Sequence, residues 1–273
     1  MLPKLGIIAG NGLLPSELTN IYTKQGGLCH LIALSGQCDI ELIKNFQHEV
    51  FYIGNAGAII DYCYKHEIQD IIFVGGINRP DLKSIKLDFV GSILMAKIIK
   101  QKILGDDNIL RIIANFFEEK GFNVISAKNI LSMNYGDKDN ISLLTNKAPS
   151  YSDNNDIQLG IKVVTNLGAL DIGQSAIVER VYVLGVEAAE GTDNLIERCA
   201  ILRKQSSGGV LVKMMKPSQD SRMDIPVIGP NTIEIMAKLK YNGIALQKEG
   251  VIIVKQEDTV ALANKYGIFI IKI

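Results

Sequence analysis

The chain has 273 residues, of which 47% are hydrophobic, so it can bury a large core and is long enough for two domains of moderate size. Lysines and arginines number 29, and aspartates and glutamates also number 29, so the formal net charge is zero. A chain without a net positive field has no long-range attraction for polyanions, and we expect no nucleic-acid partner.

Strand-length apolar runs alternate with helix-period stretches through the first half of the sequence. In chain order these are KLGIIAG (4–10), PSELTNIYTKQG (15–26), LCHLIAL (28–34), EVFYIG (49–54), NAGAIIDYCYKHE (55–67), DIIFVGG (70–76), DDNILRIIANFFEEKG (106–121) and FNVISA (122–127). Alternation of strand and helix predicts parallel strand pairing with helices on both faces of the sheet. We therefore expect an α/β fold, with an N-terminal Rossmann-like parallel-sheet domain over residues 1–130.

Residues 131–156 interrupt this alternation and are predicted to be a linker. Most of the segment is rich in Asn, Asp, Ser and Lys and lacks a sustained hydrophobic period. The pattern resumes with a helix from about residue 154, two apolar runs in SAIVERVYVLGVE (175–187), and VIIV (251–254), a helix and IFIIKI (268–273) at the end. We expect a second, C-terminal α/β domain over residues 157–273.

The sequence predicts a cytoplasmic protein. It has no apolar run of roughly 18 residues and begins with a strand pattern rather than a signal-peptide layout. Contact with a membrane surface is still compatible with this pattern. The four cysteines are far apart and lack the spacing of zinc sites or redox motifs, so we expect reduced structural thiols at Cys29, Cys38, Cys63 and Cys199.

The first strand leads into a glycine turn. Gly10, Asn11 and Gly12 permit positive φ angles and a close approach of backbone N–H groups to a ligand, and phosphate is the usual ligand of such turns. Leu13 and Leu14 follow, with Pro15 suited to the first helical turn. From these residues alone, a nucleotide-binding turn and a tight strand-to-helix connection are equally favoured.

Two departures from the dinucleotide fingerprint weigh against NAD. That fingerprint requires a third glycine where this chain has Pro15, and an acidic residue after the second strand where this chain has Ser35. A third strand-end turn, VGGINRPDL (74–82), places Arg79 where it can reach a phosphate, although a plain surface turn explains it equally well.

Acidic residues gather in two glycine-flanked groups. Asp106 and Asp107 open a helix, where ordinary capping is the favoured explanation. In the second group Glu187 ends a strand, and Glu190 and Asp193 follow within one helical turn of each other. Carboxylates beside a phosphate-binding turn suit Mg²⁺, which takes one or two protein carboxylates together with substrate phosphates.

Two polar segments of the second half are further candidates. LDIGQSAIVE (170–179) places Asp171, Gly173 and Gln174 before a strand, where a simple polar turn is slightly favoured. KPSQDSRMDIPVIG (216–229) combines cations with aspartates, an unusual mixture unless a ligand binds there, and a solvated charged loop is the alternative. Its Lys and Arg residues suit phosphate oxygens, and an aspartate suits a metal or a proton from water.

Six segments, taken together in order, resemble the LpxI family of UDP-2,3-diacylglucosamine pyrophosphatases. The resemblance covers essentially the whole chain and rests on LGIIAGNGLLPSEL, FVGGINRPDL, GDDNILR, LDIGQSAIVE, GVEAAEGTD and KPSQDSRMDIPVIGPNTI. It implies a Mg²⁺-dependent enzyme of lipid A biosynthesis, at the cytosolic face of the inner membrane, that forms UMP and 2,3-diacylglucosamine 1-phosphate by water attack on the α-phosphorus. It also implies a homodimer, a lipid substrate between two domains, and an essential aspartate in the R-x-D-x-P segment, here Asp224.

Joining the resemblance to the residue patterns gives the expected site. Asp224 is the catalytic residue, as a base or a metal ligand, and Glu190 and Asp193 are further metal ligands. The expected substrate-binding residues are Gly10, Asn11, Gly12, Leu13, Leu14, Arg79, Asp106, Asp107, Asp171, Gly173, Gln174, Glu187, Thr192, Lys216 and Arg222. The rival hypotheses are a nucleotide-dependent oxidoreductase and a non-catalytic nucleotide or lipid sensor.

Overall fold

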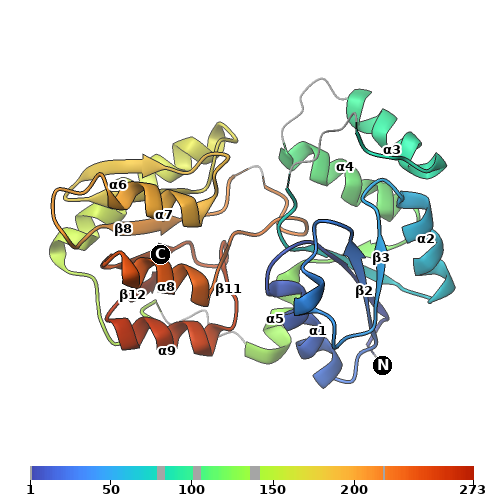
Figure 1. Cartoon of the computed structure of the whole chain (residues 1–273), viewed down its shortest axis with the longest axis horizontal. Coiled ribbons are helices and arrows are strands. Elements are labelled where there is room, and N and C mark those ends of the chain that lie inside the picture. Colours follow the sequence, from blue (N-terminus) through green and yellow to red (C-terminus); the bar gives the residue numbers. More distant parts are fainter. Residues whose placement is uncertain (1, 79–83, 101–105, 136–141, 218) are drawn as a thin grey trace. The chain divides into compact units, whose positions relative to one another are not determined.

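The computed structural model describes residues 2–78, 84–100, 106–135, 142–217 and 219–273, and it divides into two compact units (Figure 1). The first unit comprises residues 1–136 and 220–224, and the second comprises residues 137–219 and 225–273. Each unit has a five-stranded sheet with helices packed on it, which confirms the expected α/β class with two domains. Residues 220–224, expected in the C-terminal domain, belong to the first unit.

The first unit is built on a parallel sheet. Its elements are β1 (Leu5–Ala9), α1 (Leu14–Lys24), β2 (Cys29–Leu34), the 3₁₀ turn η1 (Ile40–Leu42), β3 (His48–Phe51), α2 (Ala56–Lys65), β4 (Asp70–Val74), α3 (Phe89–Lys100), α4 (Asp106–Glu119), β5 (Asn123–Val124) and α5 (Ala127–Tyr135). The strand order is β3-β2-β1-β4-β5, and every pairing is parallel. This is the order of a doubly wound sheet, whose ligands bind at the carboxyl ends of the strands where the order reverses, here between β1 and β4.

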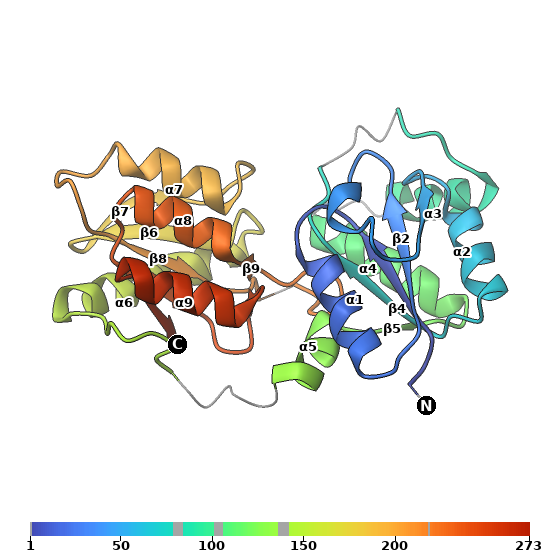
Figure 2. The same cartoon turned by 60° about the horizontal axis from the view of Figure 1, so that its bottom comes forward.

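Helices cover the first sheet in two groups. Helices α1 and α5 pack side by side, while α3 packs against both α2 and α4 (Figures 1 and 2). On the side of α2 and α4, Ile8 and Ile71 of the strands join Ile59 and Phe117 of the helices in one buried cluster. The alternate strand residue Ile7 is also fully buried, so both faces of the sheet are covered.

The second unit has a mixed sheet. Its elements are α6 (Tyr151–Ala169), β6 (Ser175–Glu179), β7 (Tyr182–Val186), α7 (Thr192–Ala200), β8 (Val210–Lys213), β9 (Val227–Ile228), α8 (Pro230–Lys238), β10 (Gly243–Leu246), β11 (Ile252–Ile253), α9 (Gln256–Tyr266) and β12 (Phe269–Lys272). In the order β12-β10-β8-β6-β7 the first three strands are parallel to one another, and β6 pairs antiparallel with both β8 and β7. Strands β9 and β11 form a separate parallel pair.

Alternate residues of this sheet face different helices. Leu211 of β8 lies in the cluster formed with α7, α8 and α9, whereas its neighbours Val210 and Val212 join Ile157 and Val164 of α6. Figure 2 shows α7, α8 and α9 lying side by side. The period of two therefore places one helix under the sheet and three above it.

The expected linker, residues 131–156, contains regular structure where it is described. Helix α5 extends to Tyr135, and α6 begins at Tyr151 behind a capping box formed by Ser150 and Asp153. The amide of Leu144 donates to the carbonyl of Ile270 at the edge of the second sheet. No helix in the described part of the chain is both long and apolar enough to cross a membrane.

Candidate functional site

Two strand-end turns of the first unit touch backbone to backbone. The amide of Gly10, after β1, donates to the carbonyl of Val74 at 2.8 Å, and Asn11 exchanges amide–carbonyl hydrogen bonds of 2.8 and 2.9 Å with Gly76. A Cβ atom on Gly10 would lie 2.5 Å from the Gly76 oxygen, and one on Gly75 would lie 2.6 Å from the Asn11 oxygen. Only glycine permits this approach, so both turns are fixed by sequence at the point where the strand order reverses.

The start of α1 next to this turn is suited to an anion. Its N-cap residue Leu13 provides no side-chain capping bond, and Pro15 occupies the first turn. Gly12 has φ +101°, is exposed, and has open space where a side chain would stand. Uncapped amides at a helix N-terminus beside open backbone are the features that bind phosphate in nucleotide-binding turns.

A third turn joins the same edge of the sheet. The amide of Asn78, after β4, donates to the side-chain oxygen of Gln37, after β2, at 2.7 Å. The turns after β1, β2 and β4 are therefore connected by hydrogen bonds. Arg79, expected to bind substrate here, lies outside the described residues, as do the side chains of Asp106 and Asp107, although α4 does begin at Asp106.

The segment that carries Asp224 is attached to the first unit. Met223 is buried in the cluster that contains Phe117, and the carbonyl of Ser221 accepts a hydrogen bond of 2.8 Å from the hydroxyl of Ser126. Asp224 itself is partly buried, and its amide donates to the carbonyl of Asp220 at 3.2 Å. The expected catalytic residue therefore belongs to the same unit as the glycine turn.

Arg222 has two carboxylate partners within this unit. Its guanidinium donates to Asp220 from Nε at 3.0 Å and from Nη2 at 2.7 Å, and Nη1 lies 2.6 Å from Glu118 of α4. The hydrogen bonds from Arg222 hold the pKa of the Asp220 carboxyl below its usual value, and the same bonds raise the pKa of Arg222. Sequence reasoning expected a substrate ligand here and missed Glu118, because these partners are 104 residues apart.

The second unit contains a buried polar cluster at the carboxyl end of β8. Lys213 donates to the hydroxyl of Thr192 and lies 3.4 Å from that of Ser175. Thr192 in turn donates to Oε1 of Glu187 at 2.8 Å, and Nζ of Lys213 is 4.0 Å from Oε2 of Glu187. Sequence reasoning missed Lys213, because it ends the apolar run VLVK and resembles an ordinary strand residue.

Gly173 and Gln174 lie against this cluster. A Cβ atom on Gly173 would lie 2.1 Å from the carbonyl oxygen of Glu187, so the backbone there requires glycine. The side-chain oxygens Oε1 of Gln174 and Oε2 of Glu187 are buried without a hydrogen-bond partner among the described residues. Two buried acceptors of this kind suit a ligand that brings its own hydroxyl or amide donors.

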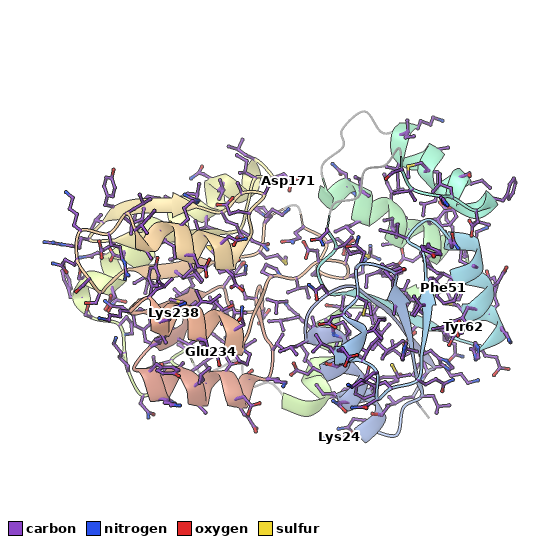
Figure 3. The ribbon with its side chains drawn as sticks, viewed as in Figure 1. Lys24, Phe51, Tyr62, Asp171, Glu234 and Lys238 are labelled. Carbon is purple, nitrogen blue, oxygen red and sulfur yellow. The ribbon has the colours of Figure 1, made fainter. Side chains whose placement is uncertain are left out.

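The remaining expected site residues have separate partners. Asp171, labelled in Figure 3, pairs with Lys216 at 2.6 Å. The carboxylate of Glu190 lies 2.6 Å from Arg198, whose hydrogen bond lowers the pKa of Glu190. Asp193 accepts from the side chain of Asn231 at 2.7 Å. In the part of the chain that the structure describes, no three His, Cys, Asp or Glu side chains form a group that could hold a metal ion.

Comparison with known proteins divides the chain into the same two parts, except for residues 220–224. Residues 4–133 match the family model of the LpxI N-terminal domain, and residues 140–271 match that of the LpxI C-terminal domain. The chain is also 32% identical over 274 residues to the UDP-2,3-diacylglucosamine pyrophosphatase LpxI of Caulobacter vibrioides. That alignment covers 98% of this chain and 96% of the relative. Because both domain models and a nearly complete relative match, this chain belongs to the LpxI family.

Proposed function

We propose that the chain hydrolyses UDP-2,3-diacylglucosamine to UMP and 2,3-diacylglucosamine 1-phosphate, a step of lipid A biosynthesis. The observation that carries this proposal is the match to the Caulobacter pyrophosphatase across 98% of the chain, which includes both units and the Asp224 segment. The glycine turn at the reversal point of a parallel sheet adds independent support, because nucleotides bind at this place in doubly wound folds.

The first unit would bind the nucleotide part of the substrate. The amides of Gly10 and Asn11 donate to the end of β4 and the turn after it, and the amide of Gly12 donates to the side chain of Asn11, so these residues shape the turn. The diphosphate would meet the open backbone at Gly12 and the uncapped first turn of α1, where the helix dipole favours it. Leu13 is the N-cap residue of α1 and Leu14 is its first residue, so both lie at the same place. We keep Arg79, Asp106 and Asp107 as proposed ligands from sequence alone.

The reaction requires one proton transfer and one displacement at phosphorus. The oxygen of water bonds to the α-phosphorus, the bond from that phosphorus to the bridging oxygen breaks, and the bridging oxygen leaves with the β-phosphate. Asp224 would either accept the proton of the water or hold a metal ion. Its position on the unit that carries the glycine turn supports a role at the diphosphate.

Magnesium dependence is part of the proposal, and the contacts of the described carboxylates indicate how many of them would bind the ion. Glu190 and Asp193 have partners elsewhere in the second unit, and no preformed group of three ligands is found among the described residues. Mg²⁺ commonly uses one or two carboxylates and takes the remaining ligands from phosphates and water, and Asp224 fits that mode as the single protein carboxylate. When bound, the ion would offset the negative charge of the diphosphate.

The second unit would bind the acylated sugar. The buried acceptors of Gln174 and Glu187 suit the hydroxyl and amide donors of a glucosamine, and Thr192 orients Glu187. Gly173, which lacks a side chain, lets the backbone before Gln174 approach that of Glu187 closely. The pair formed by Lys216 and Asp171 supplies a cation for phosphate oxygens and an acceptor for a hydroxyl.

We also propose that the protein contacts a membrane surface and that two copies of the chain form a homodimer. Helix α3 supports the membrane contact, because its apolar residues Phe89, Ile93 and Ile99 are 82%, 44% and 65% exposed. Lys86 and Lys100, both exposed, flank these apolar side chains and suit anionic headgroups.

The test is to incubate the purified protein with UDP-2,3-diacylglucosamine and Mg²⁺ and to identify the products. We expect UMP and 2,3-diacylglucosamine 1-phosphate, and in ¹⁸O-water the label should enter UMP. Label in the lipid phosphate instead would place the attack on the other phosphorus. A folded protein that releases no UMP with any divalent metal would contradict the proposal and favour a sensor, whereas tight NAD binding would favour an oxidoreductase.

A further inference from the structure

We propose that Arg222 is a positioning residue, which holds the segment bearing Asp224 on α4 through Glu118 and does not bind the phosphates of the substrate. This inference rests on the proposed role of Asp224. It concerns residues of the first unit only, all of which are described.

The guanidinium of Arg222 donates hydrogen bonds to carboxylates on two of its sides. Nε and Nη2 donate to the two oxygens of Asp220 in a forked arrangement, and Nη1 donates to Glu118 at 2.6 Å. Such a planar fork fixes direction as well as distance, which a single point charge does not. Arg222 therefore links its own turn to a helix that lies far away in the sequence.

The held turn ends at Asp224. Asp220 accepts the Arg222 amide on its carboxylate at 3.0 Å, and its carbonyl accepts the amides of Met223 at 2.9 Å and Asp224 at 3.2 Å. The backbone amide of Asp224 is thus hydrogen-bonded to Asp220, the residue whose carboxylate accepts from Arg222. Met223, buried in the core cluster, anchors the adjacent position.

Charge also argues against a phosphate-binding role for Arg222. The guanidinium of Arg222 faces the carboxylates of Asp220 and Glu118, and the charge of Arg111 also acts on Asp220, so the cations here are already balanced before any substrate arrives. A diphosphate would have to displace or tolerate these carboxylates, because like charges repel at such distances. The arrangement suits orientation of the turn better than attraction of an anion.

The ion pair is partly open to water, which makes the inference testable. The Arg222 side chain is 33% exposed and that of Glu118 is 39% exposed, and exposed pairs contribute little to global stability. Misplacement of a catalytic group by about 1 Å lowers rates about a hundredfold. Loss of the pair should therefore reduce turnover far more than it reduces folding.

The experiment compares Glu118→Gln, Arg222→Gln and Arg222→Lys with a matched control, Glu119→Gln. Glu119 is the next residue of α4 and pairs with Lys97. We expect both Gln variants of the pair to lower kcat about tenfold to a hundredfold with KM within about twofold of wild type, and Arg222→Lys to recover part of the loss. The control should behave as wild type. The double variant should be no worse than the poorer single variant.

Two outcomes would overturn the inference. One is a large rise in KM for Arg222→Gln while Glu118→Gln resembles wild type, which would make Arg222 a substrate ligand. The other is unchanged turnover in both variants. Amide hydrogen exchange at Met223 and Asp224 gives a readout that does not depend on activity, and it should accelerate in Glu118→Gln but not in Glu119→Gln. If the wild type releases no UMP, the proposed function fails, while the exchange result still decides whether the pair holds the turn.

Discussion

The ammonium group of Lys213 lies 4.0 Å from the carboxylate of Glu187 inside the second unit, and their side chains are only 3% and 7% exposed. Thr192 bridges the two by accepting from Lys213 and donating to Glu187. Charges withdrawn from water to this extent stabilise a fold only while each keeps its partners.

Replacing Lys213 by Ala should therefore destabilise the second unit strongly. The remaining Glu187 charge would be buried without its cation, which costs about 3–5 kcal/mol of unfolding free energy. Lys204→Ala, at an exposed loop position, should change it by less than about 0.5 kcal/mol. Urea unfolding followed by circular dichroism measures both. Equal effects of the two substitutions would show that the buried pair is not stabilising.

Gly10→Ala should impair nucleotide binding. Its Cβ would lie 2.5 Å from the Gly76 oxygen, so the two turns must move apart and the amides lose their alignment. We expect the affinity for UMP to fall about tenfold or more, as for other displacements of binding groups. Gly12→Ala is the comparison, because φ there is +101° but, apart from its chain neighbours, no atom of the described residues lies within 4 Å of the new methyl group. Calorimetric titration with UMP should show the larger loss for Gly10→Ala.

Asp224→Asn should remove turnover while the protein stays folded. The amide has the size of the carboxylate but neither accepts a proton nor offers a charge to a cation, so kcat should fall about 10²–10⁴-fold. Release of UMP measures the rate, and calorimetry measures retained substrate binding. Near-normal turnover in the folded variant would reject the assignment of Asp224.

His30 should make the first unit less stable in acid. Burial, followed by the charges of His66 and Lys4, holds the pKa of His30 below its ordinary value of about 6.5. The unfolded chain therefore binds the proton more readily, and the stability present above the ordinary pKa is lost as the pH falls through the lowered one. The ring contacts Tyr62, which in turn lies beside Phe51 (Figure 3).

The check is the pH dependence of unfolding in urea between neutral and mildly acidic pH. His30→Gln should flatten the decline in stability below about pH 6.5, because the group responsible for the proton uptake is gone. His48→Gln, which removes a side chain bonded to the carbonyl of Phe46, is the control. A decline as steep in His30→Gln as in wild type would assign the acid sensitivity to other groups.

Helix α3 should bind anionic lipid vesicles. Replacing Phe89 and Ile99 by Ser removes its most exposed apolar side chains, and cosedimentation with vesicles containing phosphatidylglycerol should fall about tenfold. Vesicles of phosphatidylcholine alone should bind less, since Lys86 and Lys100 then have no anionic partner. Ile201→Ser, at an 84% exposed position of the second unit, is the control. Equal binding by the two altered proteins would place the contact elsewhere, and a change in oligomeric state would assign α3 to contact between copies.

Most strands and helices of this fold were predictable from periodicity. The runs KLGIIAG and LCHLIAL correspond to β1 and β2, because strands buried on both faces are continuous apolar runs, and DDNILRIIANFFEEKG corresponds to α4, because one face of that helix is apolar. Helix α3 was not predicted. Its sequence FVGSILMAKIIK is apolar on several sides, and it packs on other helices rather than on the sheet, so no amphipathic stripe identifies it.

The candidate site was predictable only where the signal is local. The glycine turn is visible because contact of two backbones requires glycine at fixed places. Lys213 was invisible, since nothing in an apolar strand indicates that its last side chain will meet Glu187. The partner of Arg222 was equally hidden, because tertiary packing alone brings Glu118 to it across 104 residues.

Because residues 220–224 belong to the first unit, the two units are not separated by cutting the chain once between them. A fragment that ends at residue 133, where the match to the N-terminal family model ends, would lack Met223 and leave an unfilled volume beside Phe117. Supplying a synthetic peptide of residues 219–226 in trans should complement that fragment and raise its melting temperature. Because the first unit is formed by two separate stretches of the chain, no single cut in the gene separates the two units.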